Sequence, residues 1–192
     1  MKMTPLFFRK NRAALVRSID ADIFIFAANT LMQRSNDMSF AFEQEANFWW
    51  LTGIEMPDWQ LIIDDLAKKS YLVAPAIDTM HQVFDGSLSN IDAKMMSGVD
   101  KVLSYTDGQD FMRELANKHS TIATLGSDAR VKYYDFTLNP APIKLSRRLN
   151  RQHKEVRDCR PEPARLPAIK QPAQSEAIKR AVQLTVAAFE IA

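Results

Sequence analysis

Cysteine, glycine and histidine are scarce in this chain of 192 residues, and each scarcity excludes a class of site. The single cysteine, Cys159, excludes a disulfide framework and a zinc site built from paired cysteines. The five glycines stand singly, so no glycine-rich loop is available to hold a phosphate group. The three histidines are far apart and none belongs to a His-Glu-x-x-His pair, so the sequence predicts no metal site of that kind.

Long hydrophobic runs and a strong net charge are also missing. The apolar run near the amino terminus is broken by charge after four residues, which is too soon for a signal peptide. The longest later run, Ile23–Ala28, is too short to cross a bilayer. The net charge of +2 is too small to indicate a nucleic-acid partner. We therefore expect a cytoplasmic protein that binds neither a membrane nor nucleic acid.

The composition that remains is that of a soluble globular protein, with 46% hydrophobic and 25% charged residues. The length suits one domain with a full core and an extra piece at one end. A first helix is predicted after Thr4, which can cap it, with Pro5 in its first turn. The run Ile23–Ala28 lacks polar alternation, which indicates a strand covered on both faces.

Strands alternate with helices along the rest of the chain. This pattern predicts an α/β fold, a three-layer mixed β-sheet with helices on both faces. The further strands expected are 59–63 and 71–74, joined as a hairpin, and 121–125. The helices expected are 47–53, 78–84, 90–97, 107–119 and 143–154, and residues 29–45 are expected to form a long irregular loop.

The last 35 residues change in character. Four prolines fall between Asp158 and Pro172, a density typical of a linker. A helix follows, with Ile178, Val182 and Phe189 among the apolar residues at helical spacing. Its pattern stops without a closing signal, so we expect its apolar face to belong to a part of the protein beyond this chain.

Two groups of polar residues could carry chemistry. Asp78, His81 and Asp85 share one helical stretch, and we interpret them as a solvated polar face rather than a metal site. A basic stretch between Lys144 and Arg160 could bind phosphate groups. It has no interleaved aromatic residue, so a solvated or interdomain face is the favoured interpretation.

Five short motifs occur in order along the chain. They are Gln33-Arg34-Ser35-Asn36-Asp37, the segment from Phe42 through Phe48-Trp49-Trp50 to Gly53, Asp58-Trp59, Phe84-Asp85-Gly86, and Lys170-x-Pro172. In order and spacing these motifs resemble those of the amino-terminal domain of aminopeptidase P. The helix that contains Ile178-Lys179-Arg180-Ala181 resembles the opening helix of the catalytic domain of that family. The resemblance covers essentially the whole chain.

The resemblance implies a creatinase-like amino-terminal domain at 1–157, a linker at 158–171, and the first helix of a truncated pita-bread catalytic domain at 172–192. The family's two divalent metal ions, often manganese, sit on aspartate, histidine and glutamate residues further downstream. None of those positions lies in this chain. We therefore expect no catalytic residue, no metal ligand and no cofactor here, and no activity of the chain alone.

The parent protein is then expected to be a Xaa-Pro aminopeptidase, a metal-dependent hydrolase and homo-oligomer. Its substrate would be a peptide with proline at the second position. This domain would shape the active-site mouth and the oligomer contacts. Two alternatives share the layout: a prolidase-type dipeptidase, and a metal-free module of the same fold that binds a peptide or protein.

The sequence departs from the family pattern at three positions. Glu43 stands where arginine is usual, and Pro167 falls where a basic residue is typical. Phe84 replaces the tryptophan that in aminopeptidase P reaches the active site of a neighbouring subunit. Phe84 and Gly86 are therefore expected to line a substrate site or an interface, with a core role for Phe84 as the alternative.

Arg34 and Asp37 complete the expected site residues. They lie in the long polar segment, and we expect them to hold it in place by charge-assisted hydrogen bonds, partly buried against Trp49 or Trp50. Core packing is the alternative role for the aromatic run, because buried aromatic rings contribute a large apolar area.

Overall fold

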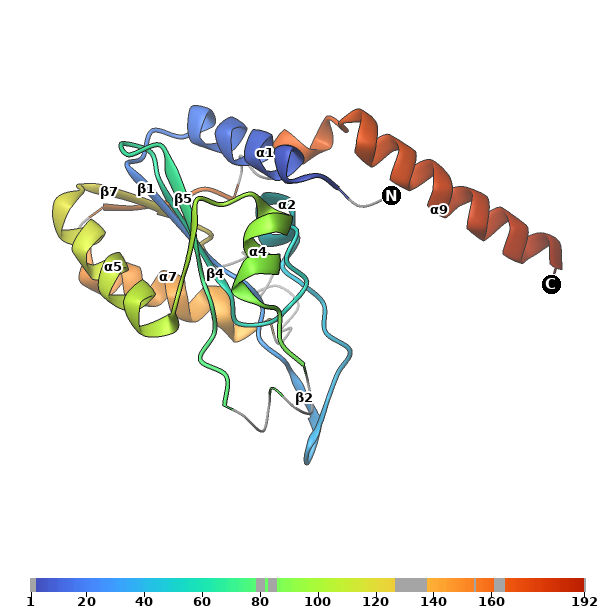
Figure 1. Ribbon diagram of the computed structural model, residues 1–192, viewed down its shortest axis with the longest axis horizontal. Coiled ribbons are helices and arrows are strands. Elements are labelled where there is room, and N and C mark those ends of the chain that lie inside the picture. The colour runs from blue at the N-terminus through green and yellow to red at the C-terminus, as the bar shows by residue number, and fades with distance from the viewer. Residues whose placement is uncertain are drawn as a thin grey trace.

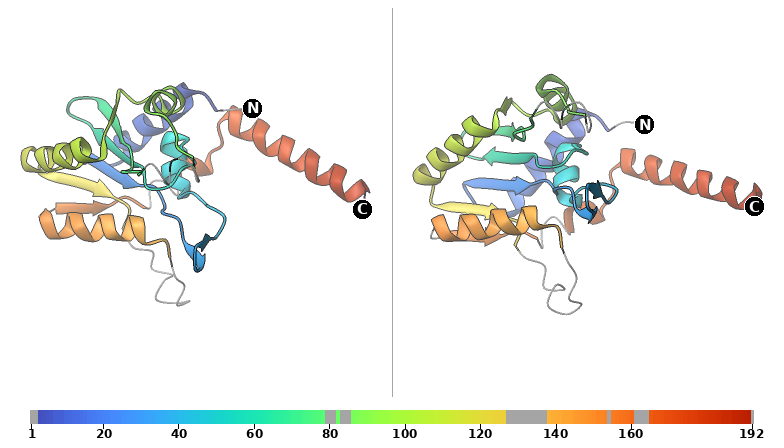
Figure 2. Two further views of the ribbon diagram at one scale, coloured as in Figure 1. Left: turned by 60° about the horizontal axis from the view of Figure 1, so that its bottom comes forward. Right: turned by 90° about the horizontal axis from the view of Figure 1, so that it is seen from below.

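A computed structural model of the chain describes residues 3–78, 82, 86–126, 138–153, 155–160 and 165–191. A mixed six-stranded sheet has helices on both faces, and a small two-stranded sheet projects beside it (Figures 1 and 2). The predicted α/β class and three-layer arrangement are confirmed. The helices are α1 Pro5–Ser18, α2 Ala46–Thr52, α4 Asn90–Ser97, α5 Tyr105–Lys118, α7 Pro140–Gln152 and α9 Pro172–Ile191, with a 3-10 turn η1 at Leu166–Ala168. The strands are β1 Ile23–Ala27, β2 Gln33–Ser35, β3 Met38–Ser39, β4 Gln60–Asp64, β5 Lys69–Val73, β6 Lys101–Leu103, β7 Thr121–Thr124 and β8 Glu155–Asp158.

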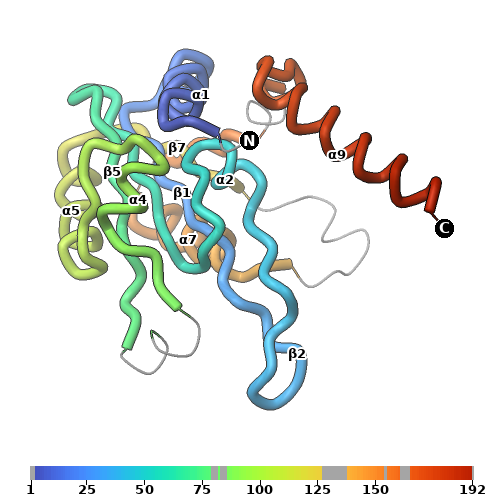
Figure 3. Tube along the Cα trace, turned by 45° about the vertical axis from the view of Figure 1, so that its right-hand side comes forward, coloured from blue at the N-terminus to red at the C-terminus, as the bar shows by residue number. Residues whose placement is uncertain are grey.

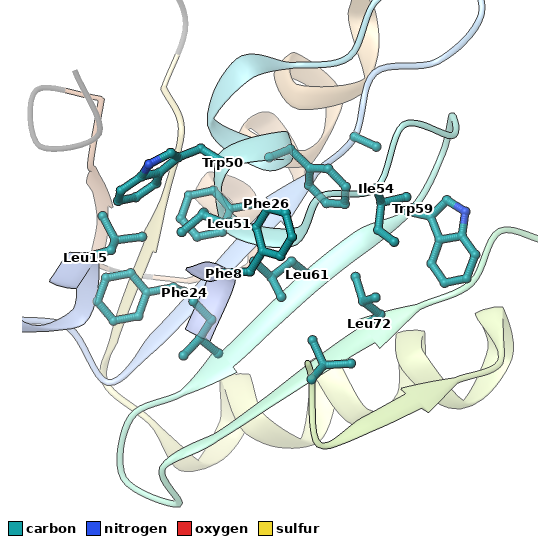
Figure 4. Close-up of a cluster of buried hydrophobic side chains, with 14 of the residues drawn as sticks. Phe8, Leu15, Phe24, Phe26, Trp50, Leu51, Ile54, Trp59, Leu61 and Leu72 are labelled. Carbon is teal, nitrogen blue, oxygen red and sulfur yellow. The ribbon is translucent and has the colours of Figure 1, made fainter. Parts of the chain in front are cut away.

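Strand β1 lies inside the sheet, whose order is β6-β5-β4-β1-β7-β8. Its side chains alternate between two cores, as expected for a strand. Phe24 and Phe26 join the core under α1, α2 and α4, where they lie near Phe8 in Figure 4. Ile23 and Ile25 join the core under α5 and α7. All five residues of β1 are buried, so the prediction of a strand covered on both faces is confirmed.

Strand β4 runs opposite to the other five strands of the sheet. It pairs antiparallel with both β1 and β5, and the pairs β1–β7, β7–β8 and β5–β6 are parallel. The predicted β4–β5 hairpin is confirmed. Because the five other strands share one direction, their carboxyl ends meet at one edge of the sheet. In open α/β sheets this edge is where ligands bind.

Arg12 joins three helices on one face of the sheet. Its guanidinium group donates to the carbonyl oxygens of Leu51 at 2.7 Å, Ser97 at 3.0 Å and Gly98 at 3.1 Å. These carbonyls lie at the carboxyl ends of α2 and α4, where a cation is favoured by the helix dipole. The Arg12 side chain is buried, which lowers its pKa to about 10, so it stays charged at neutral pH.

Helix α2 ends at Gly53, as the sequence predicts. Gly53 has a φ of +72°, a left-handed conformation that residues with a Cβ rarely adopt. Its N–H donates to the carbonyl of Trp49 at 2.7 Å. The ring of Phe8 lies directly against it, and a Cβ added to Gly53 would come within 2.3 Å of the Phe8 Cζ. The end of α2 therefore requires glycine both for its backbone angle and for space.

The polar segment 29–45 is more regular than expected. Strands β2 and β3 pair antiparallel within it and turn at Asn36, which has a φ of +35°. Asparagine tolerates this conformation better than most residues do. The prediction of an irregular loop is therefore wrong for 33–39, where the segment forms a hairpin that projects from the sheet (Figure 3).

The sheet extends further along the chain than the expected domain range. Strand β8 pairs with β7 and runs to Asp158. Cys159 is buried, and its N–H donates to the carbonyl of Thr124 at 2.9 Å. The first residue of the expected linker, Asp158, therefore belongs to the sheet, and Cys159 is held against the end of β7. Strands β6 and β8 were not expected from the sequence.

Helix α9 begins beside the domain and then leaves it. Gln171 donates from its side chain to Asn11 at 2.6 Å, and its N–H donates to the side chain of Gln174 at 3.0 Å, an arrangement that caps the helix. None of the described residues of α9 is buried, and Figure 1 shows the helix pointing away from the sheet. Val182 and Phe189 are more than half exposed, so the apolar face has no partner among the described residues.

Candidate functional site

A large hollow lies where the parallel strands end. It has a volume of about 1060 Å³, which suits a ligand groove. It is lined by the segments that follow β1 and β5 and by those that precede β4, α4 and α5. The lining residues are Leu31, Ser39, Phe42, Glu55, Met56, Pro57, Asp58, Trp59, Gln60, Pro75, Ala76, Ile77, Asp78, Gly86, Leu88 and Tyr105. We call this hollow the edge groove.

The edge groove combines apolar walls with acidic groups. Among the described lining residues the charged ones are Glu55, Asp58 and Asp78, and none of that lining is lysine, arginine or histidine. The Glu55 carboxylate accepts a hydrogen bond from the indole N–H of Trp49 at 2.9 Å. Asp58 has a φ of +63°, and its N–H donates to the carbonyl of Asn29 at 2.9 Å. The groove therefore presents negative charge beside apolar surface.

Gln44 fixes the backbone on one side of the edge groove. Its side-chain nitrogen donates to the carbonyls of Ile54 at 3.1 Å and Met56 at 3.0 Å. Its side-chain oxygen accepts from the N–H groups of Asn29 and Glu45, both at 2.9 Å. One amide group thus satisfies four backbone groups from three segments. It belongs to the segment from Phe42 to Gly53, but no periodicity in the sequence singles it out.

Replacing Gln44 by alanine is expected to destabilise the domain by about 1–3 kcal/mol, because four backbone groups lose a partner in a partly buried place. Urea denaturation measures the loss. Gln33→Ala is the matched control, since the exposed Gln33 side chain makes one local bond, to the Asn36 carbonyl. That control should stay within about 0.5 kcal/mol. Equal losses for the two variants would show that Gln44 does not hold the groove wall.

A smaller hollow of about 240 Å³ adjoins the edge groove and, unlike the groove, has basic residues in its described lining. The two share Asp58, Trp59, Gln60 and Tyr105. Lys144 and Arg148 from α7 line the smaller one. Arg148 donates to the side chain of Gln109 at 2.6 Å, which holds its guanidinium group in place. Asp58 therefore lines both hollows, with Glu55 in the edge groove and with Lys144 and Arg148 in the smaller one.

The expected site residues do not all meet at the groove. Gly86 lines it, whereas Phe84 lies outside the described residues. Arg34 and Asp37 are exposed on the hairpin. Neither side chain takes part in the hydrogen bonds and ion pairs found in the described part of the chain, so the expectation that they anchor this segment is wrong. They lie on either side of Asn36, at the turn of the hairpin that projects from the sheet.

The two other groups of polar residues expected from the sequence, around Asp78 and along α7, form no metal site among the described residues. Within the described ranges, no group of three or more histidine, cysteine, aspartate or glutamate side chains could hold a metal ion. Asp78 lines the edge groove, and His81 and Asp85 lie outside the described residues. On α7, Lys144, Arg147 and Arg151 are exposed, as a solvated face would be. Among the described residues, no helix is both long and apolar enough to cross a membrane.

Comparison with known families gives one assignment for most of the domain. The family profile described as "Aminopeptidase P, N-terminal domain" matches residues 8–123. Xaa-Pro aminopeptidase of Escherichia coli (strain K12) is 27% identical over 191 residues, which cover 94% of this chain and 42% of that protein. Human Xaa-Pro aminopeptidase 3 is 24% identical over 180 residues, which cover 86% of this chain and 33% of that protein. The chain therefore spans less than half the length of these relatives.

Solved structures show the same fold. A putative aminopeptidase P from Bacillus anthracis matches 93% of this chain and 43% of its own, with a TM-score of 0.79 and 22% identity. Aminopeptidase P from E. coli with the inhibitor Pro-Leu matches 98% of this chain and 44% of its own, with a TM-score of 0.77 and 23% identity. The fold expected from the sequence motifs is confirmed.

Proposed function

Because this chain belongs to the family of aminopeptidase P amino-terminal domains, we propose that it is the non-catalytic part of a Xaa-Pro aminopeptidase. The observation that carries the proposal is how much of each protein the alignment with the E. coli enzyme covers. Nearly the whole chain aligns with the E. coli enzyme, but with only 42% of its length. The relatives reported above are named as aminopeptidases, which favours this activity over a prolidase-type dipeptidase.

The chemistry of the parent protein would lie outside this chain. The metal pair of the family requires a cluster of carboxylates and histidines, and the described residues offer no such set. No step of the reaction is therefore assigned to them. In the proposed parent, residues outside this chain would hold two divalent metal ions, manganese in our expectation, which would supply Lewis-acid activation of water. The substrate would be a peptide with proline at the second position.

The role proposed for this domain is to shape the mouth of the active site and the contacts of a homo-oligomer. The edge groove and the exposed apolar residues of the hairpin, Met38 and Phe40, support a role in contacts. Phe84, Gly86, Arg34 and Asp37 are the residues proposed to line substrate or interface. A linker that begins after Asp158, where β8 ends, and runs to 171 is part of the same proposal, with 172–192 as the first helix of the catalytic domain. A cytoplasmic location stays a prediction.

The purified chain is expected to release no amino acid from a peptide such as Gly-Pro-Leu, with or without manganese. The reason is the lack of a metal-binding cluster among the described residues. Amino acid release is measured by chromatography, with E. coli Xaa-Pro aminopeptidase as the positive control. Release by the chain itself, abolished by a chelator, would show that the catalytic assignment is wrong.

A further inference from the structure

Exposed apolar side chains are frequent in the segments that follow the parallel strands, and some of them line the edge groove. Six large ones lie in segments that follow the carboxyl ends of parallel strands, and each is at least a third exposed. They are Leu31, Met38, Phe40, Ile77, Tyr105 and Leu138. Three of the six, Leu31, Ile77 and Tyr105, line the groove itself. Exposed apolar surface gathered around a hollow is typical of an interaction site.

The charge of the groove limits what can occupy it. Glu55 and Asp58 stand in the lining, and none of its described members is lysine, arginine or histidine. A cleft lined by one sign of charge concentrates the field of that sign. Nucleic acid and anionic membrane surfaces would be repelled, and a peptide with positive charge would be attracted. Lys144 and Arg148 line the adjoining smaller hollow, which shares Asp58 but not Glu55, so the positive group of a ligand is expected at Glu55.

We propose that the edge groove binds an extended peptide segment with apolar side chains and one or two positive charges. The apolar side chains would lie on walls such as Phe42, Ile77 and Tyr105, and a lysine or arginine would pair with Glu55 and Asp58. Glu55 is already held by the Trp49 indole, so little order is lost when it pairs. Binding of this kind needs no catalytic domain, so it stands or fails apart from the aminopeptidase assignment.

The test is a calorimetric titration of the chain with two short peptides blocked at both ends. One has the sequence Leu-Lys-Phe-Lys-Leu and the other Leu-Glu-Phe-Glu-Leu. The lysine peptide is expected to bind at least about tenfold more tightly, and its affinity should fall with added salt. Backbone amide shifts in an NMR titration are expected at residues 56, 58–60 and 76–78, since Pro57 and Pro75 have no N–H. Equal affinity of the two peptides, no binding of either, or shifts confined to α7 would overturn the proposal.

A double variant tests whether Glu55 and Asp58 make the charge contact with the peptide. The double variant Glu55→Gln and Asp58→Asn is expected to weaken the lysine peptide by about tenfold or more. Asparagine is chosen at 58 because it accepts the left-handed backbone found there. Asp65→Asn, in the β4–β5 turn at the opposite edge of the sheet, is the matched control and should bind as the unmodified chain does. An unchanged urea midpoint confirms that the double variant is folded, and unchanged affinity in it would overturn the proposal.

Discussion

Replacing Arg12 by methionine is expected to destabilise the domain by about 3–5 kcal/mol, the range found when one partner of a buried charged contact is removed. Methionine is apolar and fills similar space, so the change removes the donors with little change in volume. The carbonyls of Leu51, Ser97 and Gly98 would then lose their buried donor. Each unsatisfied group costs about 1–3 kcal/mol, offset in part because the buried charge is gone.

Urea denaturation of the two proteins measures this difference. Arg113→Met is the control, because Arg113 is exposed on α5 and pairs with the exposed Asp110. Exposed pairs of this kind contribute about 0–1 kcal/mol. Arg12→Lys is also expected to lose stability, since an ammonium group cannot reproduce the planar fork of a guanidinium. A loss for Arg12→Met no larger than that of the control would mean that the three helix ends do not depend on Arg12.

Replacing Gly53 by alanine is expected to destabilise the domain by about 2–4 kcal/mol. The left-handed backbone accounts for about 1–2 kcal/mol of this. The new methyl group would also meet the Phe8 ring at 2.3 Å in a packed core, and overpacking adds about 1–3 kcal/mol. The backbone strain and the overpacking both arise at Gly53, on the face of the sheet where α1 and α2 meet.

Gly86→Ala is a close control for this experiment. Gly86 has a φ of +75°, nearly the same as Gly53, but a Cβ added there would meet no atom within 4 Å. Its loss is expected to be only the backbone part, about 1–2 kcal/mol. The difference between the two variants in urea isolates the contact with Phe8. Phe8→Leu combined with Gly53→Ala should recover part of that difference, and equal losses for the two glycine variants would exclude the contact as a cause.

The elements that the sequence predicted well are those with a strong local signal. The apolar run at Ile23–Ala27 and the glycine after α2 both correspond to what the structure contains. Strands β6 and β8 carry weak signals, because they are only three and four residues long and contain charged side chains. They are strands because β5 and β7 offer them a parallel partner, which is a tertiary effect.

The polar residues that organise the domain were harder to predict. Arg12 lies four residues after Phe8 and three before Leu15, so it shares their face of α1, and this spacing was an available signal for its burial. Gln44 offered no such signal, since its bonds reach backbone groups that only the fold brings together. Arg34 and Asp37 have opposite charges in one polar segment, but the turn between them leaves both exposed.

The place of β8 in the sheet has a consequence for how a nascent chain can fold. Strand β7 pairs with β1 on one side, and its other side stays open until residues 155–158 emerge from the ribosome. An open strand edge can pair with another chain. The carbonyl oxygen of Thr124 accepts a hydrogen bond from the N–H of Cys159, the residue that follows β8. During synthesis that side of β7 therefore stays exposed to mispairing until β8, which begins at Glu155, has been made. An expression fragment that stops before Glu155 would keep that edge permanently.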